Sequence, residues 1–152
     1  MSGTHIFRIK GNTIIVSIDT KTLSTYIRLV SEAVATALFL EKQKNISIEV
    51  YLLTDRSMKE INKTFKHKNT VTNVLSFECP SDPVFSKRKE RKKHVGEIYL
   101  APRYITRKKE DIVALSLHGA LHLLGYDHKK RDDRKKMEKR EGEIYVRVKR
   151  GK

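Results

Sequence analysis

Three histidines close together in the C-terminal half constrain this chain more than any other feature. His118 and His122 lie four residues apart, so on a helix they occupy the same face one turn apart. Gly125 suits the position just after a helix end, where the backbone becomes left-handed, and the chain can then return His128 towards the other two. A catalytic zinc is held by three such ligands with a fourth position open. The pattern therefore predicts a zinc site, formed by His118, His122 and His128, at the end of a central helix.

The same spacing, His-x-x-x-His-x-x-Gly-x-x-His, is the ligand frame of the metzincin peptidases, in which a glutamate follows the first histidine and serves as the base. Here that position is Gly119. The metal frame is intact while the peptidase base is missing, which favours a hydrolytic site for a substrate other than a peptide. A metallopeptidase is the first alternative. Two histidines on an apolar helix can also be ordinary buried imidazoles, but the third histidine and the glycine in register favour a metal.

The charge of the chain favours a polyanionic partner. Its 152 residues, interpreted as a single domain over 1–152, include 33 lysines and arginines against 18 aspartates and glutamates, a formal net charge of +15. Such an imbalance indicates nucleic acid or an acidic membrane as partner, or an adaptation for solubility. The run 87–93 contains six basic residues within a segment, 80–94, that is predicted to be a loop. Such clusters contact phosphates in nucleic-acid-binding proteins.

The cysteine content and the hydropathy of the chain indicate where in the cell the protein is expected. A single cysteine, Cys79, allows no intramolecular disulfide, which suits a cytoplasmic protein. Cys79 is either a fourth metal ligand or a small hydrophobic residue. Residues 1–12 lack the features of a signal peptide, and no apolar run is judged long enough to cross a bilayer, so no membrane partner is expected. His5 and His94 have no partner pattern and are expected at the surface.

Hydrophobic periodicity gives the order β-α-β-α-β-β-α-α. The four predicted strands are residues 14–18, 46–52, 72–78 and 95–100, and residues 5–9 either pair beside the first or lead into it. The four predicted helices are 23–44, a short one over 58–65, an apolar and buried one over 108–124, and one after residue 131. This order predicts an α/β (α+β) fold with one mixed, mostly parallel sheet of about four strands covered by helices, the last two strands forming an antiparallel pair.

Residues 118–128, His-Gly-Ala-Leu-His-Leu-Leu-Gly-Tyr-Asp-His, resemble the signature of the YbeY family of bacterial and organellar endoribonucleases. Two further stretches agree with that family in order and approximate spacing. They are residues 61–68 followed by 72–77, and Gly-Glu-Ile-Tyr at 96–99. The resemblance extends from about residue 46 to residue 145, and the first forty residues match only in their general pattern.

The resemblance implies a metal-dependent endonuclease that acts on single-stranded RNA. It implies a role in ribosomal RNA processing, especially maturation of the 3′ end of the small-subunit RNA, and in ribosome quality control. The expected partners are ribosomal RNA and the ribosome or its assembly factors. One Zn²⁺ per chain would be held by the three histidines in a cleft between sheet and helices, and no small-molecule cofactor is expected.

Two catalytic residues follow from the resemblance, His118 and Lys66. Lys66 stands where the family usually has an arginine that contacts phosphate; lysine keeps the charge but loses the bidentate fork, and Arg56 is a candidate to assist it. Asn73 stands where aspartate is common and cannot act as a base. Asp127 either orients a ligand imidazole or is a solvated turn residue.

The nucleophile is left open by the sequence. A zinc-bound water, with its pKa lowered to about 7, would attack phosphorus directly, or the metal would polarise a phosphoryl oxygen while the RNA 2′-hydroxyl attacks. The second alternative function is a non-enzymatic RNA- or ribosome-binding module with a structural zinc. Structural zinc sites usually have four protein ligands and favour cysteine, which argues against it.

Overall fold

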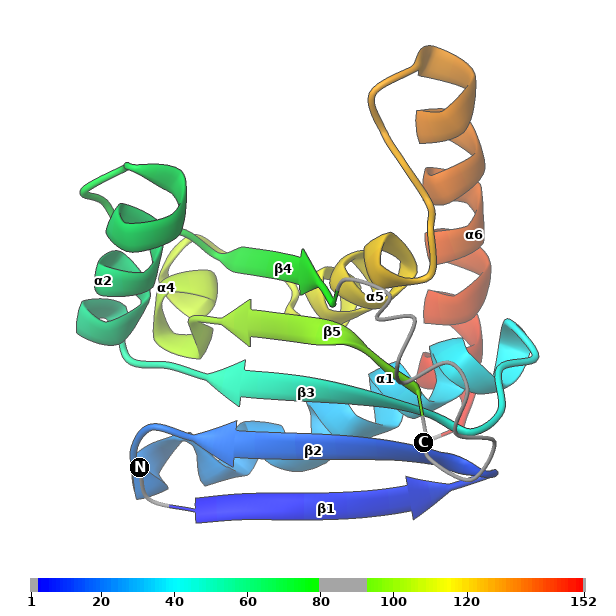
Figure 1. The fold of residues 1–152 in the computed structure, drawn as a ribbon, viewed down its shortest axis with the longest axis horizontal. Helices are drawn as coiled ribbons and strands as arrows, with labels where there is room; N and C mark the ends of the chain where they lie inside the picture. Colours follow the sequence, from blue (N-terminus) through cyan, green and yellow to red (C-terminus); the bar gives the residue numbers. More distant parts are fainter. Residues whose placement is uncertain (1–2, 80–92, 152) are drawn as a thin grey trace.

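A five-stranded sheet with the strand order β1-β2-β3-β5-β4 forms the centre of the computed structural model, which describes residues 3–79 and 93–151 (Figure 1). The strands are β1 (Gly3–Ile9), β2 (Asn12–Ile18), β3 (Ile46–Leu52), β4 (Val74–Glu78) and β5 (Lys93–Leu100). The helices are the 3₁₀ helix η1 (Lys21–Tyr26), α1 (Ile27–Leu40), α2 (Asp55–Lys66), α4 (Pro102–Arg107), α5 (Ile112–Leu123) and α6 (Arg131–Arg150). The basic run 87–93 lies, except for Lys93, outside the described residues.

The sheet is mixed, as predicted, but it has five strands rather than about four. The additional strand is β1, which pairs antiparallel with β2 across the turn at Lys10 and Gly11. Both turn residues have positive φ, +51° and +83°, the conformation of a tight β-hairpin turn. β2 and β5 both run parallel to β3, and β4 pairs antiparallel with β5, as predicted for the last two strands. Two of the four pairings are therefore antiparallel, so the sheet is not mostly parallel.

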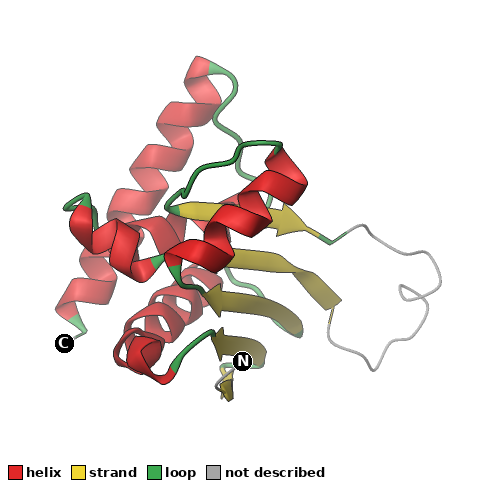
Figure 2. Ribbon diagram, turned by 90° about the vertical axis from the view of Figure 1, so that its left-hand side faces the viewer, coloured by secondary structure: helices red, strands yellow, loops and turns green. Residues whose placement is uncertain are grey.

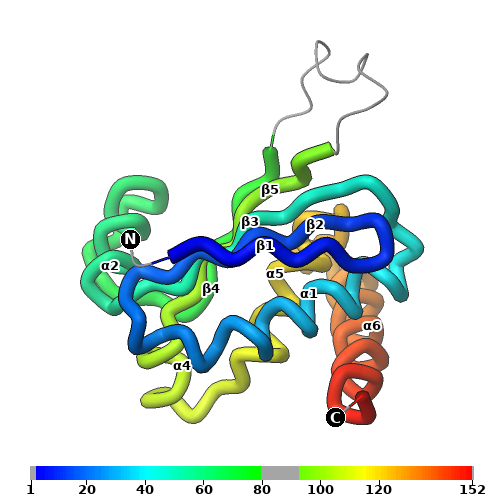
Figure 3. The backbone as a smooth tube through the Cα atoms, turned by 90° about the horizontal axis from the view of Figure 1, so that it is seen from below, coloured from blue at the N-terminus to red at the C-terminus, as the bar shows by residue number. Residues whose placement is uncertain are grey.

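α1 and α5 cover one face of the sheet (Figure 2; Figure 3). The predicted apolar stripe of α1 is confirmed, because its inner residues have no exposed surface; they are Val30, Ala33, Val34, Ala37 and Leu38. The stretch Lys21–Leu40 is long and apolar enough to cross a membrane by length and composition, which corrects the expectation that no such run exists. Its stripe packs against β2 and α5 in the main core, as expected of a core helix.

α5 begins at Ile112 rather than near Lys108 because Asp111 caps it. The Asp111 carboxylate accepts hydrogen bonds from the amides of Val113, at 2.8 Å, and Ala114, and from the hydroxyl of Tyr145 on α6. Burial works to raise the pKa of Asp111, but these hydrogen bonds outweigh it and hold the pKa below its usual value. Residues 108 and 109 form a turn, and before them lies α4, a short helix that was not predicted and that starts at Pro102, a favoured first helical residue.

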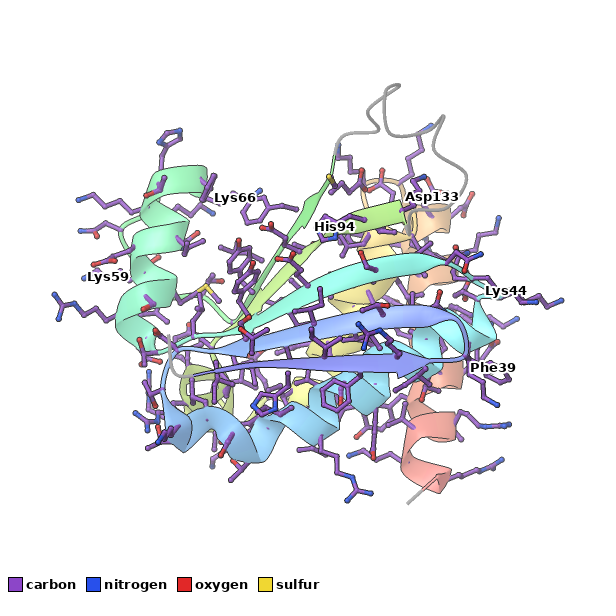
Figure 4. The ribbon with its side chains drawn as sticks, turned by 60° about the horizontal axis from the view of Figure 1, so that its bottom comes forward. Phe39, Lys44, Lys59, Lys66, His94 and Asp133 are labelled. Atoms are coloured by element: carbon purple, nitrogen blue, oxygen red, sulfur yellow. The ribbon has the colours of Figure 1, made fainter. Side chains whose placement is uncertain are left out.

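The opposite face of the sheet is covered at one end by α2. A small second core forms there from Leu53, Met58 and Ala101, which are buried beneath α2 and the start of α4. Thr54 caps α2 by accepting a hydrogen bond from the amide of Ser57, so the helix starts at Asp55, earlier than the predicted 58–65. α2 therefore ends beside β4 at the edge of the sheet, and its last residue is Lys66 (Figure 4).

Candidate metal site and nucleic-acid cleft

The end of α5 has the geometry that brings the histidines together. Gly125 has φ of +102°, which favours glycine, and its amide donates to the carbonyl of His122 at 3.1 Å. The next amide, of Tyr126, donates to the carbonyl of Leu121 at 3.0 Å. These two bonds form a Schellman motif, which ends the helix and turns the chain back. The predicted helix end is thus confirmed, and the turn carries His128 towards α5.

The three imidazoles converge on one point. One ring nitrogen from each of His118, His122 and His128 lies within 4.8 Å of the other two, and His122 Nε2 is 3.0 Å from His128 Nδ1. The ring centroids are 4.8 to 5.7 Å apart. His118 and His122 are half-buried, whereas His128 is exposed. This donor set fits one metal ion with a side open to solvent, and Cys79, the possible fourth ligand, is exposed and does not belong to the group.

A cleft of about 560 Å³ joins the histidines to β4 and α2. Its walls are Lys66, the three histidines, and residues 74–78 of β4. Lys66, the second predicted catalytic residue, is therefore brought to the histidines by α2, although 52 positions separate it from His118 in the sequence. Ser76 also lines this cleft. A cation beside three imidazoles suits a negatively charged phosphate group.

Glu141 on α6 orients the first histidine. His118 Nδ1 is 2.6 Å from Glu141 Oε1, and both side chains are largely shielded from solvent. A carboxylate that accepts a hydrogen bond from Nδ1–H keeps the proton on Nδ1. The Nε2 lone pair is then available for a metal, and the orientation of the ring is fixed. No role for Glu141 was predicted from the sequence. The available signal was a carboxylate among the apolar residues Met137, Ile144 and Val148 on that side.

A hydrogen-bond network fixes the turn that carries His128. The hydroxyl of Tyr126 donates to the Glu41 carboxylate, at 3.0 Å to Oε2. Glu41 also pairs with Arg140 of α6, which in turn donates to the carbonyl of Leu40 at 2.9 Å. The turn is thereby tied to the end of α1 and to α6. Neither Glu41 nor Arg140 was singled out from the sequence, because 85 and 14 positions separate them from Tyr126.

Burial and neighbouring imidazoles lower the pKa of His122. Desolvation is the main cause, and the positive charge that His118 and His128 carry when protonated adds to it. Because its pKa is lowered, the His122 ring stays neutral at pH values where an ordinary histidine would begin to take up a proton. The neutral form is the one that binds a metal, so the crowding of the three rings favours the state that the site requires.

Gly119 has a packing role. A Cβ atom added there would lie 3.0 Å from Cγ2 of Ile98, a fully buried residue of β5. α5 therefore lies as close to the sheet as the glycine allows, and no side chain at this position points towards the histidines. A glutamate corresponding to the peptidase base would require Ile98 or α5 to shift.

Some candidates from the sequence lie outside the cleft. Asp127 accepts a hydrogen bond from the amide of Lys129 at 3.0 Å, which makes it a turn residue, the second of its two predicted roles. Arg56 lies in the first turn of α2 beside Glu60, at the far end of the helix from Lys66. Asn73 donates to Glu110 at 3.1 Å and accepts from the amide of Val74, so it fixes the start of β4.

A second group of possible ligands lies on the face of the sheet opposite α1 and α5, where Glu49, His94 and Glu97 converge. His94 is half-buried and its Nδ1 is 3.2 Å from Ser47 Oγ, which corrects the expectation of a surface residue without a partner. Each carboxylate accepts a hydrogen bond from the tyrosine two positions further along its strand. These side chains already have partners within the sheet, so the three-histidine group is the better metal site.

Fold and site together define an α/β protein with three convergent histidines at the end of a core helix and, beside them, a cleft that Lys66 lines. The chain belongs to the family described as Endoribonuclease YbeY, whose model matches residues 9–149. The family suggested by the three sequence stretches is thereby confirmed.

Relatives from several bacteria carry the same description. The chain is 35% identical over 114 residues to Endoribonuclease YbeY of Pelagibacter ubique, an alignment that covers 70% of this chain and 72% of the relative. It is 38% identical over 118 residues to that of Buchnera aphidicola subsp. Cinara cedri, covering 72% and 73%. A solution structure of a Thermotoga maritima protein aligns with a TM-score of 0.52 at 20% identity, over 90% of this chain and 93% of that one, and shows the same fold.

Proposed function

We propose that this chain is a zinc-dependent endoribonuclease that cleaves single-stranded RNA in ribosomal RNA processing, including maturation of the 3′ end of the small-subunit RNA, and in ribosome quality control. Membership of the YbeY family supports the activity class. The observation that carries the proposal is the convergence of three imidazole nitrogens within 4.8 Å at a cleft that Lys66 also lines. The net charge of +15 suits an RNA or ribosomal partner, and the single cysteine suits a cytoplasmic location.

The proposed ligands are His118, His122 and His128, and a bound zinc would supply Lewis acidity and lower the pKa of water at the site. Glu141 holds the proton of His118 on Nδ1 and so aims Nε2 at the metal position. Lys66 neutralises charge that develops on the phosphate during cleavage. The Schellman turn and the Tyr126–Glu41 contact keep His128 in place, so that the three ligands are positioned before the metal binds.

Two features disfavour the alternative functions. Gly119 packs against Ile98 and carries no side chain, so the peptidase base is absent from its usual position. Among the described residues, the three-histidine group contains no fourth cysteine or carboxylate ligand, as a structural zinc site would have.

The decisive experiment compares a single-stranded RNA with a duplex of the same sequence, with and without a chelator, while bound metal is quantified. We expect cleavage of the single strand that stops with chelator and returns when zinc is restored. A 2′,3′-cyclic phosphate on the product would assign the attack to the RNA 2′-hydroxyl. Chelator-sensitive digestion of casein would favour the peptidase, and RNA binding without cleavage by metal-replete protein would favour the binding module.

Replacing Glu141 should weaken the metal site without removing a ligand. We expect Glu141→Ala to lower zinc affinity or cleavage rate by about 10- to 100-fold, the usual effect of losing the partner of a ligand imidazole. Glu141→Gln keeps a hydrogen-bond acceptor and should retain part of the affinity. The measurement is the zinc dissociation constant by competition with a chelating dye. Glu138→Ala, an exposed glutamate one turn earlier on α6, is the matched control. Equal affinity in Glu141→Ala and the control would remove Glu141 from the site.

A further inference from the structure

A row of four aromatic rings crosses the face of the sheet that bears α2 and reaches the cleft at Phe77. The rings come from α2, β4, β5 and β3, in the order Phe65, Phe77, Tyr99 and Tyr51. Successive centroids are 5.2, 5.7 and 4.8 Å apart, within the range of favourable aromatic contacts. The inner rings support one another, while the outermost, Phe65, keeps 57% of its surface exposed. The row therefore presents a fixed aromatic surface to solvent at its α2 end.

This exposed end lies beside the predicted catalytic groups. Phe77 lines the same cleft as Lys66 and the three histidines, and the Lys66 Nζ lies 5.7 Å from the centre of the Phe77 ring. Lys66 follows Phe65 in the chain, at the end of α2. An aromatic surface and a cation at the same cleft match the two chemical parts of a nucleotide, a flat base and a negatively charged phosphate.

We propose that Phe65 and Phe77 form a stacking site for an unpaired nucleobase of the RNA, adjacent to the phosphate that is held by Lys66 and the histidine site. This inference rests on the proposed function in taking RNA as the substrate. A base in a duplex is stacked and paired, so its face is not available to a protein ring, whereas a base in a single strand is free to stack. The stacking site thus gives a physical cause for single-strand preference.

An exposed phenylalanine does not by itself indicate a stacking site. Phe39, a second exposed phenylalanine of this chain, serves as a comparison. Phe39 on α1 is 49% exposed and has Lys10 Nζ at 5.6 Å from its ring centre. It lines neither the histidine cleft nor the hollow beside α6, and it lies far from Lys66 on the molecule (Figure 4). Phe65 differs in its ring contact with Phe77, which itself lines the histidine cleft, and in its place next to Lys66 in the chain.

The test uses the full-length protein and single-stranded oligoribonucleotides that carry one 2-aminopurine, whose fluorescence falls when it stacks. Stopped-flow mixing records this quenching in the binding phase, before cleavage. For the wild type we expect quenching at one or two positions next to the cleaved bond. Phe65→Ala should lose the quenching and weaken binding by about 5- to 150-fold, the range for loss of one base-stacking contact. Phe65→Tyr should restore both, and Phe39→Ala should match the wild type.

Steady-state cleavage separates this inference from the proposed function. Phe65→Ala should raise KM and reduce the preference for single strands over duplex. If RNA is cut and the quenching and KM of Phe65→Ala equal those of the wild type, the stacking site is overturned while the endoribonuclease stands. If quenching depends on Phe65 but the metal-replete wild type does not cut RNA, the stacking site stands and the nuclease proposal fails.

Discussion

His122→Ala is expected to cleave RNA more than about 100-fold more slowly than the wild type and to lose stoichiometric zinc. Loss of a hydrogen-bond partner of a ligand alone costs about 10- to 100-fold, and loss of the ligand itself should exceed that range. His122 contacts both partner rings, because it lies one turn along α5 from His118 and its Nε2 is 3.0 Å from His128 Nδ1. Its removal leaves two ligands, too few for a stable zinc site.

This variant should fold normally, because the His122 side chain is half-buried and takes no part in capping α5, and the alanine keeps the backbone carbonyl that the Gly125 amide contacts. Thermal unfolding and circular dichroism would check that, and single-turnover cleavage with parallel metal analysis would measure the effect. His5→Ala, an exposed histidine on β1, is the control and should cut at the wild-type rate. Undiminished cleavage by His122→Ala would point to a contaminating nuclease or to a different catalytic site.

Gly96→Ala is expected to destabilise the fold by about 3 kcal/mol, the upper part of the usual range for overpacking. A Cβ atom at Gly96 would lie 2.3 Å from the carbonyl oxygen of Phe77 and 2.7 Å from the Leu123 side chain. The first contact is with the backbone of β4, which cannot move aside without disturbing its pairing with β5. Because β4 forms a wall of the histidine cleft, cleavage should fall together with stability.

The opposite result is expected at Gly142, in the interior of α6. A Cβ atom there meets nothing within 4 Å, so Gly142→Ala should stabilise the chain by up to about 1 kcal/mol through helix propensity. Urea unfolding midpoints of the two variants, each against the wild type, measure both effects. A Gly96→Ala variant as stable as the wild type would show that β4 and β5 can separate at no cost, contrary to the packing described.

Features that depend on neighbours in the chain were predicted correctly from the sequence. The stripe of α1 and the alternation in β3 are local patterns that match the burial found. The end of α5 is local as well, since a glycine three residues after His122 is sufficient to form the Schellman turn. The sequence left β1 open as either a strand or a lead-in, because it is an edge strand without a fully buried residue, and its pairing with β2 identifies it. The helix expected from Lys108 starts later because its cap, Asp111, is held by Tyr145 of α6.

The sequence by itself determined the three-histidine pattern, the β-α order and the cationic character of the chain, since each is a property of residue type and spacing. Only the tertiary structure decided what surrounds the histidines. Glu141 reaches His118 from α6, Lys66 arrives from α2, and the aromatic row joins three strands and a helix. These contacts link residues far apart in the chain, and they depend on how the sheet and helices pack. The spacing of residues along the sequence does not give the distances between side chains that come from different helices and strands.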